Sequence, residues 1–228
     1  MNDYSDSIGW PTKDPQWISK VVVQSLIYII PIVGWIALLG WMLAALDNLR
    51  QGRRDLPSAG FNGLGRGATL FFVFLIYGLA IACVFVILFF LGIALAAAGS
   101  NNGQGGPLSA LGALLVVLAY GIAILAGIAF YFLMAPIIVA TERGGFAAGI
   151  NLPQVLAMAR VNPSSTLFAG LFILVGHLIG SLGSILCGVG IYLTIAYGYA
   201  VMAGVVSVYE RQAVPQPMPP AYPAAPPA

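Results

Sequence analysis

Three long tracts of the chain contain no Asp, Glu, Lys or Arg: residues 21–46, 67–141 and 161–209. Only 7% of the 228 residues are charged and 60% are hydrophobic, whereas soluble domains carry about 25% charged residues. So few charges cannot cover a surface that faces water, so the solvent for most of the chain is a bilayer. The tracts predict an all-α polytopic integral membrane protein.

The middle tract, residues 67–141, is too long for one crossing. It is interrupted by GSNNGQGGP at residues 99–107, a polar and Gly-rich stretch typical of a loop. This loop has no Lys or Arg, so the positive-inside rule places it away from the cytoplasm. The two loops that contain Arg residues, and with them the N- and C-termini, are then expected on the cytoplasmic side.

The first tract contains the sequence YIIPIVGWIALLGW, in which Pro31 and Gly34 lie close together. As one crossing, it would put Lys13 and Lys20 on the side opposite Arg50. As a hairpin that turns at Pro31 and Gly34, it keeps every Lys and Arg on one side. Proline and glycine both favour a break in the helix. Each arm would span only about 21–27 Å against a core of about 30 Å, so we expect a short or re-entrant hairpin.

The third tract has a similar interruption, LCGVG, at residues 186–190, with Gly188 and Gly190 as the expected turn. This similarity reflects either a degenerate internal repeat or a sequence pattern that Gly-rich membrane hairpins commonly share. We therefore expect about six membrane segments in one domain, residues 14–212: 17–30, 35–49, 67–98, 108–139, 164–186 and 190–209. A surface helix is expected at about 152–160, a polar arm at 1–13, and a disordered Pro-rich tail at 213–228.

The order of several short motifs resembles a prokaryotic family of multi-pass membrane proteins known only as a domain of unknown function. These motifs are DPQW, IIPIVG, LGW, LRQG, LP, VNPSSTLF and the closing YGYAVMAGVVSVYE. The resemblance covers about residues 14–212. The chain departs from the family pattern after Leu56 and Pro57, where an aromatic residue is usual and Phe61 is the nearest candidate. The resemblance implies a bacterial or archaeal cell membrane and brings no activity or cofactor with it.

His177 is the only histidine and the only ionisable group deep in the uncharged tracts. Ionisable residues within a membrane suggest a function, such as a proton relay or a ligand contact. The alternative is a neutral imidazole that is hydrogen-bonded to a neighbouring helix. No carboxylate lies at comparable depth, which argues against a metal site or a two-residue relay within one chain.

Small residues at a spacing of four predict close helix packing in the third tract. Gly176 and Gly180 form a GxxxG motif, and Ala200 and Gly204 form a second small pair. Such pairs let membrane helices approach closely. The partner helix could lie in the same chain or in another subunit. Cys83 and Cys187 both fall in apolar segments and are expected to be buried small hydrophobes rather than a disulfide.

The basic residues of the first loop are Arg50, Arg53, Arg54 and Arg66. They can set the topology or meet anionic lipid headgroups, and Asp47 can pair with Arg50 at the end of its helix. The net charge of +2 does not suggest a nucleic-acid partner. No catalytic, metal or cofactor motif is visible in the sequence.

These features favour a non-catalytic membrane component, an accessory or scaffold subunit. Its partners would be the bilayer and a protein bound through helix faces or the Pro-rich tail, in an oligomeric state that the sequence leaves open. The alternative is a small-solute transporter or channel that uses the broken helices and His177.

Overall fold

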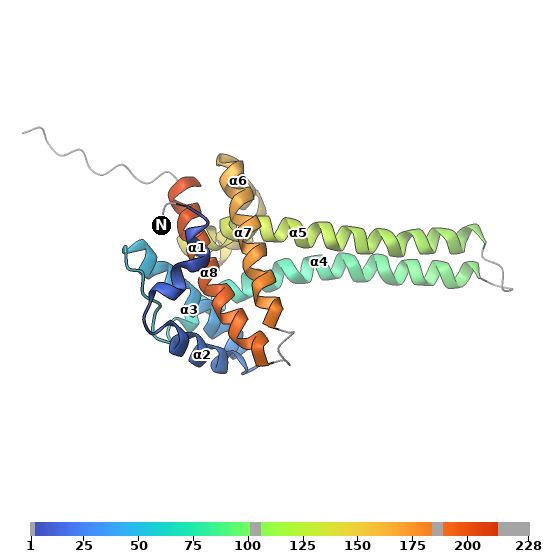
Figure 1. Cartoon of the computed structure of the whole chain (residues 1–228). Coiled ribbons are helices and arrows are strands. Elements are labelled where there is room, and N and C mark those ends of the chain that lie inside the picture. Colours follow the sequence, from blue (N-terminus) through green and yellow to red (C-terminus); the bar gives the residue numbers. More distant parts are fainter. Residues whose placement is uncertain (1–2, 101–105, 184–188, 214–228) are drawn as a thin grey trace, which may run out of the picture.

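A computed structural model describes residues 3–100, 106–183 and 189–213, and every regular element in these ranges is a helix. The elements are α1 (Asp6–Gly9), η1 (Trp10–Lys13), α2 (Trp17–Tyr28), α3 (Val33–Arg50), α4 (Leu64–Gly99), α5 (Pro107–Ile150), α6 (Leu152–Val161), α7 (Pro163–Leu182) and α8 (Val189–Ala213). The all-α prediction is confirmed. Figure 1 shows a compact body from which α4 and α5 extend together as a long hairpin.

Four helices within the described ranges are long and apolar enough to cross a bilayer: α4, α5, residues Pro163–Ser181 of α7 and Tyr192–Ala213 of α8. The protein is therefore a polytopic membrane protein, but the expected six segments are wrong in number. Helix α2 has 12 residues, or about 18 Å of rise, against a hydrocarbon core of about 30 Å. Helix α3 is a core helix with most of its residues buried inside the protein.

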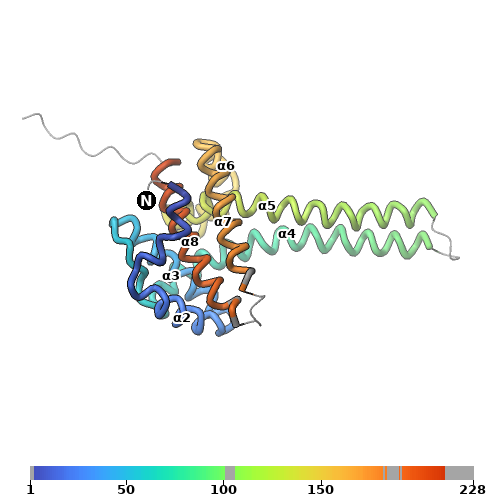
Figure 2. Tube along the Cα trace, in the orientation of Figure 1, coloured from blue at the N-terminus to red at the C-terminus, as the bar shows by residue number. Residues whose placement is uncertain are grey.

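The α4–α5 hairpin is held together by small residues and aromatic rings. A Cβ added to Gly92 would lie 2.9 Å from the Gly112 carbonyl oxygen, so the two backbones meet because neither residue has a side chain. Tyr120 packs edge-on against Phe85 and Phe89 at ring-centroid distances of 5.3 and 5.9 Å. The Cα trace in Figure 2 shows that this hairpin projects far beyond the other helices.

The break predicted in the first tract lies between α2 and α3. Helix α2 ends at Tyr28 and α3 begins at Val33, with Pro31 exposed in the connection. The positive φ of 64° is at Ile32 rather than at a glycine. Gly34 lies inside α3, where an added Cβ would be 2.7 Å from the Tyr28 carbonyl oxygen. Gly34 therefore permits a close approach after the turn.

Helix α3 occupies the centre of the body. Trp41 is buried and its indole Nε1–H donates to the Pro57 carbonyl at 3.2 Å. On one side α3 crosses α4 with the two backbones in contact. A Cβ on Gly40 would lie 2.6 Å from the Gly63 carbonyl oxygen, and one on Gly67 would lie 2.7 Å from the Gly40 nitrogen. Protein, rather than lipid, therefore surrounds most of α3.

Helices α7 and α8 pack against each other through the small residues predicted from the sequence. A Cβ on Gly176 would lie 3.6 Å from Val201, and one on Gly180 would lie 3.7 Å from the Cα of Ile195. Ala200 and Gly204 are also buried. The partner helix for these contacts is therefore in the same chain.

The second expected turn differs from the structure. Gly190 lies in the first turn of α8 rather than in a connection, and its carbonyl oxygen lies against the position that a Cβ on Gly183 would take. Gly188 and Cys187 lie outside the described residues. Cys83 is exposed on α4 and free, so the expectation that it is buried is wrong, because α4 presents most of its surface outward.

The N-terminal segment, expected as a polar arm, is packed onto the body. Trp10 is fully buried and its indole Nε1–H donates to the Ala200 carbonyl at 3.0 Å. The Tyr4 hydroxyl donates to the Ser165 carbonyl at 3.1 Å. Two aromatic side chains thus attach residues 4–13 to α7 and α8, which the polar composition of this stretch concealed.

Candidate functional site: a charged cluster and an uncharged pocket

Five charged side chains from four helices meet at one point on the body. They are Asp47 and Arg50 from α3, Arg66 from α4, Glu142 from α5 and Glu210 from α8. The Arg50 guanidinium donates to Glu210 through Nη2 at 2.6 Å and through Nε at 2.9 Å. This bidentate geometry is the strongest that an arginine and a carboxylate adopt. We refer to these residues as the charged cluster.

The two arginines bridge all three carboxylates of the charged cluster. Arg50 also contacts Asp47 at 2.9 Å and Glu142 at 3.4 Å. Arg66 contacts Asp47 at 2.5 Å and also pairs with Glu142. The Glu142 and Glu210 side chains are only 10% and 12% exposed, so water screens these pairs less than surface pairs. The charged cluster joins α3, α4, α5 and α8 through side chains from distant parts of the sequence.

The electrostatics of Asp47 show which effect dominates in the charged cluster. Partial burial alone would raise the pKa of Asp47, but hydrogen bonds and charge attraction from Arg66 and Arg50 outweigh it. The net result is a pKa below the ordinary value of 3.8. Asp47 is therefore ionised at neutral pH and acts as a structural partner rather than as a proton carrier.

Of the four arginines expected at lipid headgroups, two lie in the charged cluster and two lie outside it. Arg50 and Arg66 belong to the charged cluster. Arg53 donates to the Asn48 side chain at 2.5 Å and lies 3.9 Å from Asp55 in an exposed pair. Arg54 is exposed on the loop between α3 and α4. Arg53 and Arg54 are exposed and do not belong to the charged cluster, so they suit contact with headgroups.

A second polar contact fastens the N-terminal segment to the loop between α3 and α4. The Asp14 carboxylate is 4% exposed and accepts from Lys20 Nζ at 2.7 Å. It also accepts from the backbone amides of Gln16 and Leu56, each at 2.8 Å. Burial would raise the pKa of Asp14, but these bonds outweigh it and the net pKa is lowered.

Replacement of Asp14 by Asn is expected to lower the free energy of unfolding by about 1.5–3 kcal/mol at pH 7, because a buried charge-assisted network is lost. A lowered folded-state pKa contributes stability above the unfolded pKa of about 3.9, and this contribution is lost as the pH falls through the folded value. The difference between wild type and Asp14→Asn should therefore shrink below about pH 4. Detergent-solubilised protein unfolded at pH 7 and pH 3 measures it. Asp6→Asn, at an exposed position, is the control and should change little at either pH.

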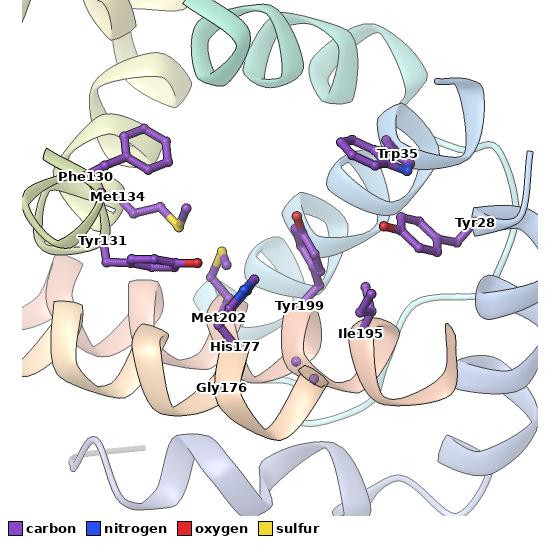
Figure 3. Close-up of a pocket in the computed structure, with 13 residues that line it drawn as sticks. Tyr28, Trp35, Phe130, Tyr131, Met134, Gly176, His177, Ile195, Tyr199 and Met202 are labelled. Atoms are coloured by element: carbon purple, nitrogen blue, oxygen red, sulfur yellow. The ribbon is translucent and has the colours of Figure 1, made fainter. Parts of the chain in front are cut away.

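His177 borders an uncharged pocket of about 440 Å³ between the α2–α3 turn and helices α5, α7 and α8. The His177 ring lies 5.3 Å from the Tyr131 ring, measured between centroids. Figure 3 shows Phe130, Tyr131 and Met134 of α5 on one side of this space and Tyr28, Trp35 and Tyr199 on the other. No Asp, Glu, Lys or Arg is among the residues that line it. We call this space the aromatic pocket.

The aromatic pocket contains hydrogen-bonding groups without an acid–base pair. Its polar side-chain groups are the hydroxyls of Tyr28, Tyr131 and Tyr199, the indole N–H of Trp35 and the imidazole of His177. In the part of the chain that the structure describes, no group of three His, Cys, Asp or Glu side chains is placed to hold a metal ion. The pocket can therefore bind and orient a molecule through these groups and its ring surfaces.

The family model described as "Protein of unknown function (DUF4013)" matches residues 23–189. The chain belongs to this family. The match confirms the resemblance seen in the sequence, and it agrees with a membrane protein of unspecified function. No curated protein and no solved structure matches the chain.

The DUF4013 region contains most of both candidate sites. Four members of the charged cluster lie within residues 23–189, and Glu210 lies beyond them. His177 and Tyr131 lie within the region, and Tyr199 lies outside it. Each site thus joins the DUF4013 region to α8.

Sequence reasoning found His177, Arg50 and Arg66 but missed what surrounds them. Glu142 and Glu210 were visible only as charges at the ends of uncharged tracts, which was the available signal for the charged cluster. Tyr131 and Tyr199 gave no signal, because tyrosines in an apolar helix are ordinary core residues. The expected pair of Asp47 and Arg50 is present at 2.9 Å.

Proposed function

We propose that this DUF4013 protein is a non-catalytic membrane component, an accessory or scaffold subunit of a prokaryotic cell membrane with both termini in the cytoplasm. The observation that carries the proposal is the exposed flank of the α4–α5 hairpin. In the most apolar 18-residue window of each of these helices, only 6% of the residues are buried. The two helices therefore offer a long surface that the rest of the described chain does not cover.

One face of α4 is suited to another helix as well as to lipid. Gly78 and Ala82 are exposed at a spacing of four residues, and a Cβ added to Gly78 would meet nothing within 4 Å. Small residues at this spacing let the backbone of a second membrane helix approach closely. Since the body is held together by its own charged cluster, the hairpin is free to serve as the contact surface.

Replacement of Gly78 and Ala82 together by Ile is expected to release a bound partner while the protein itself remains folded. The reason is that two branched side chains would keep a partner helix away from α4. The measurement is native mass spectrometry of the tagged protein after gentle extraction, with the stoichiometry of any co-purified protein compared between variants. Deletion of residues 213–228 in a parallel sample separates a role of the Pro-rich tail from that of the hairpin.

Gly121→Ile on α5 is the matched control. Gly121 is also exposed with open space beside it, but its neighbours four residues away are the large Val117 and Leu125, so it forms no small pair. A stoichiometric partner lost in the α4 variant and kept in the control would support the proposal. A protein that carries no partner in any sample, or a partner unaffected by both changes, would contradict it.

The alternative function, a small-solute transporter or channel, draws on His177 beside the aromatic pocket. Helices α2 and α3 are not among the candidate membrane spans, so support for this alternative comes from His177 and the pocket rather than from a pair of similar hairpins. Solute flux in proteoliposomes that is lost in His177→Leu would favour this alternative over the subunit role.

A further inference from the structure

We propose that the aromatic pocket is a binding site for an uncharged, lipid-soluble molecule with a flat head that carries carbonyl oxygens, the chemical class of the quinones. This inference is independent of the subunit role. The volume of about 440 Å³ is within the about 300–1,000 Å³ of small-molecule sites. Such a site is expected to be mostly apolar with a few polar groups that fix orientation, which describes this lining.

The absence of charge in the lining selects the charge of the ligand. A charged head in an apolar site needs an opposite charge or a dense set of hydrogen bonds. All thirteen lining residues are uncharged apart from the titratable His177. Glu142 and Glu210 are not among the lining residues, and both pair with Arg50 in the charged cluster. The ligand is therefore neutral.

The polar groups of the pocket select acceptors on the ligand. Tyr28, Tyr131 and Tyr199 each bring a hydroxyl group to the lining of the pocket. Figure 3 shows the hydroxyl of Tyr131 on the α5 side of the space and those of Tyr199 and Tyr28 on the other side. Hydroxyls and indole N–H groups donate hydrogen bonds, so a head with carbonyl oxygens at opposite ends matches this arrangement.

The walls of the pocket select the shape of the head and its route of access. Phe130, Tyr131, Trp35 and Tyr199 present ring surfaces, which pack well against a flat ring. His177 is exposed on the part of α7 that is long and apolar enough to span a membrane. The pocket therefore reaches the apolar surface of the molecule, where a lipid-soluble ligand arrives from the bilayer.

The test uses the full-length protein in lipid nanodiscs and 2-decyl-1,4-benzoquinone as the probe. The readout is quenching of tryptophan fluorescence as the quinone concentration rises. We expect saturable quenching in the wild type and loss of most of the saturable part in Trp35→Phe, since Trp35 lines the pocket. Tyr131→Phe and Tyr199→Phe should each weaken binding by about two- to tenfold, the effect of one hydrogen bond.

A pair of glycines on α5 provides a test that does not depend on removing a packed side chain. Gly127 lines the pocket, and neither it nor Gly121 has any atom within 4 Å of an added Cβ. Gly127→Leu should fill the pocket and abolish saturable quenching, whereas Gly121→Leu should leave it unchanged. Equal helical circular dichroism and elution volume of the two variants establish that both are folded.

Three outcomes would overturn the proposal. Quenching that rises without saturation in the wild type would show partitioning into lipid alone. Equal saturable quenching in the two glycine variants would place the quinone elsewhere. Tighter binding of tetrabutylammonium than of the quinone, unaffected by Tyr131→Phe, would make the pocket an aromatic cage for cations.

Discussion

Alanine at Gly67 is expected to cause one of the largest losses of stability of any single methyl group added to this protein. The Cβ would be placed against the carbonyl oxygen of Ile36 and 2.7 Å from the nitrogen of Gly40. These atoms belong to the backbone of α3, which is central and buried and therefore cannot move aside. Overpacking of a core costs about 1–3 kcal/mol, and we expect the upper end of that range for a clash with backbone.

The measurement for Gly67→Ala is the midpoint of unfolding on titration with a denaturing detergent, followed by circular dichroism. Gly65→Ala is the control on the same helix, two residues away. Gly65 is exposed and an added Cβ there meets nothing within 4 Å, so alanine should stabilise the helix by about 0.5–1 kcal/mol. Equal midpoints for the two variants would contradict the close crossing of α3 and α4.

Replacement of Arg50 by Met is expected to lower the free energy of unfolding by about 2–3 kcal/mol. It leaves Glu142 and Glu210, which are 10% and 12% exposed, without their shared partner. Loss of one member of a buried pair costs about 3–5 kcal/mol. The smaller value applies here because the Arg50 side chain is 33% exposed, so water and salt screen part of the interaction.

The control for Arg50→Met is Arg54→Met, at an exposed position on the loop that follows α3, which should change the free energy of unfolding by no more than about 0.5 kcal/mol. The double variant Arg50→Met with Glu210→Gln should recover part of the loss, since the unpaired carboxylate is removed with its partner. If Arg50→Met and the control had the same free energy of unfolding, the charged cluster would not contribute to the stability of the protein. An additive double variant would show that Arg50 and Glu210 do not interact.

The places where sequence and structure agree depend on local patterns. The uncharged tracts predicted α4, α5, α7 and α8, because the requirement to satisfy backbone hydrogen bonds in lipid leaves an apolar run of this length no alternative to a helix. Pro31 marked the end of α2 for an equally local reason, its missing amide hydrogen. Asn151 and Pro153 likewise begin α6, where the Asn151 side chain accepts from the Gln154 amide at 3.3 Å.

The places where they differ depend on contacts between residues far apart in the chain. The sequence could not distinguish the apolar α3, which is apolar because protein surrounds it, from a helix surrounded by lipid. Hydropathy measures how unfavourable contact with water is for a side chain, and it does not distinguish a lipid neighbour from a protein neighbour. For the same reason Cys83 was expected inside the protein and lies outside it.

By itself, the sequence determined that this chain is a helical membrane protein, which of its segments are apolar, and where its charges and breaks lie. Only the tertiary structure decided that Arg50 pairs with Glu142 and Glu210, that Arg66 pairs with Glu142, and that His177 shares a pocket with Tyr28, Tyr131 and Tyr199. Charge pairs and pockets depend on which helices become neighbours. That choice is made by backbone contacts such as those at Gly40 and Gly67, which join helices across the fold.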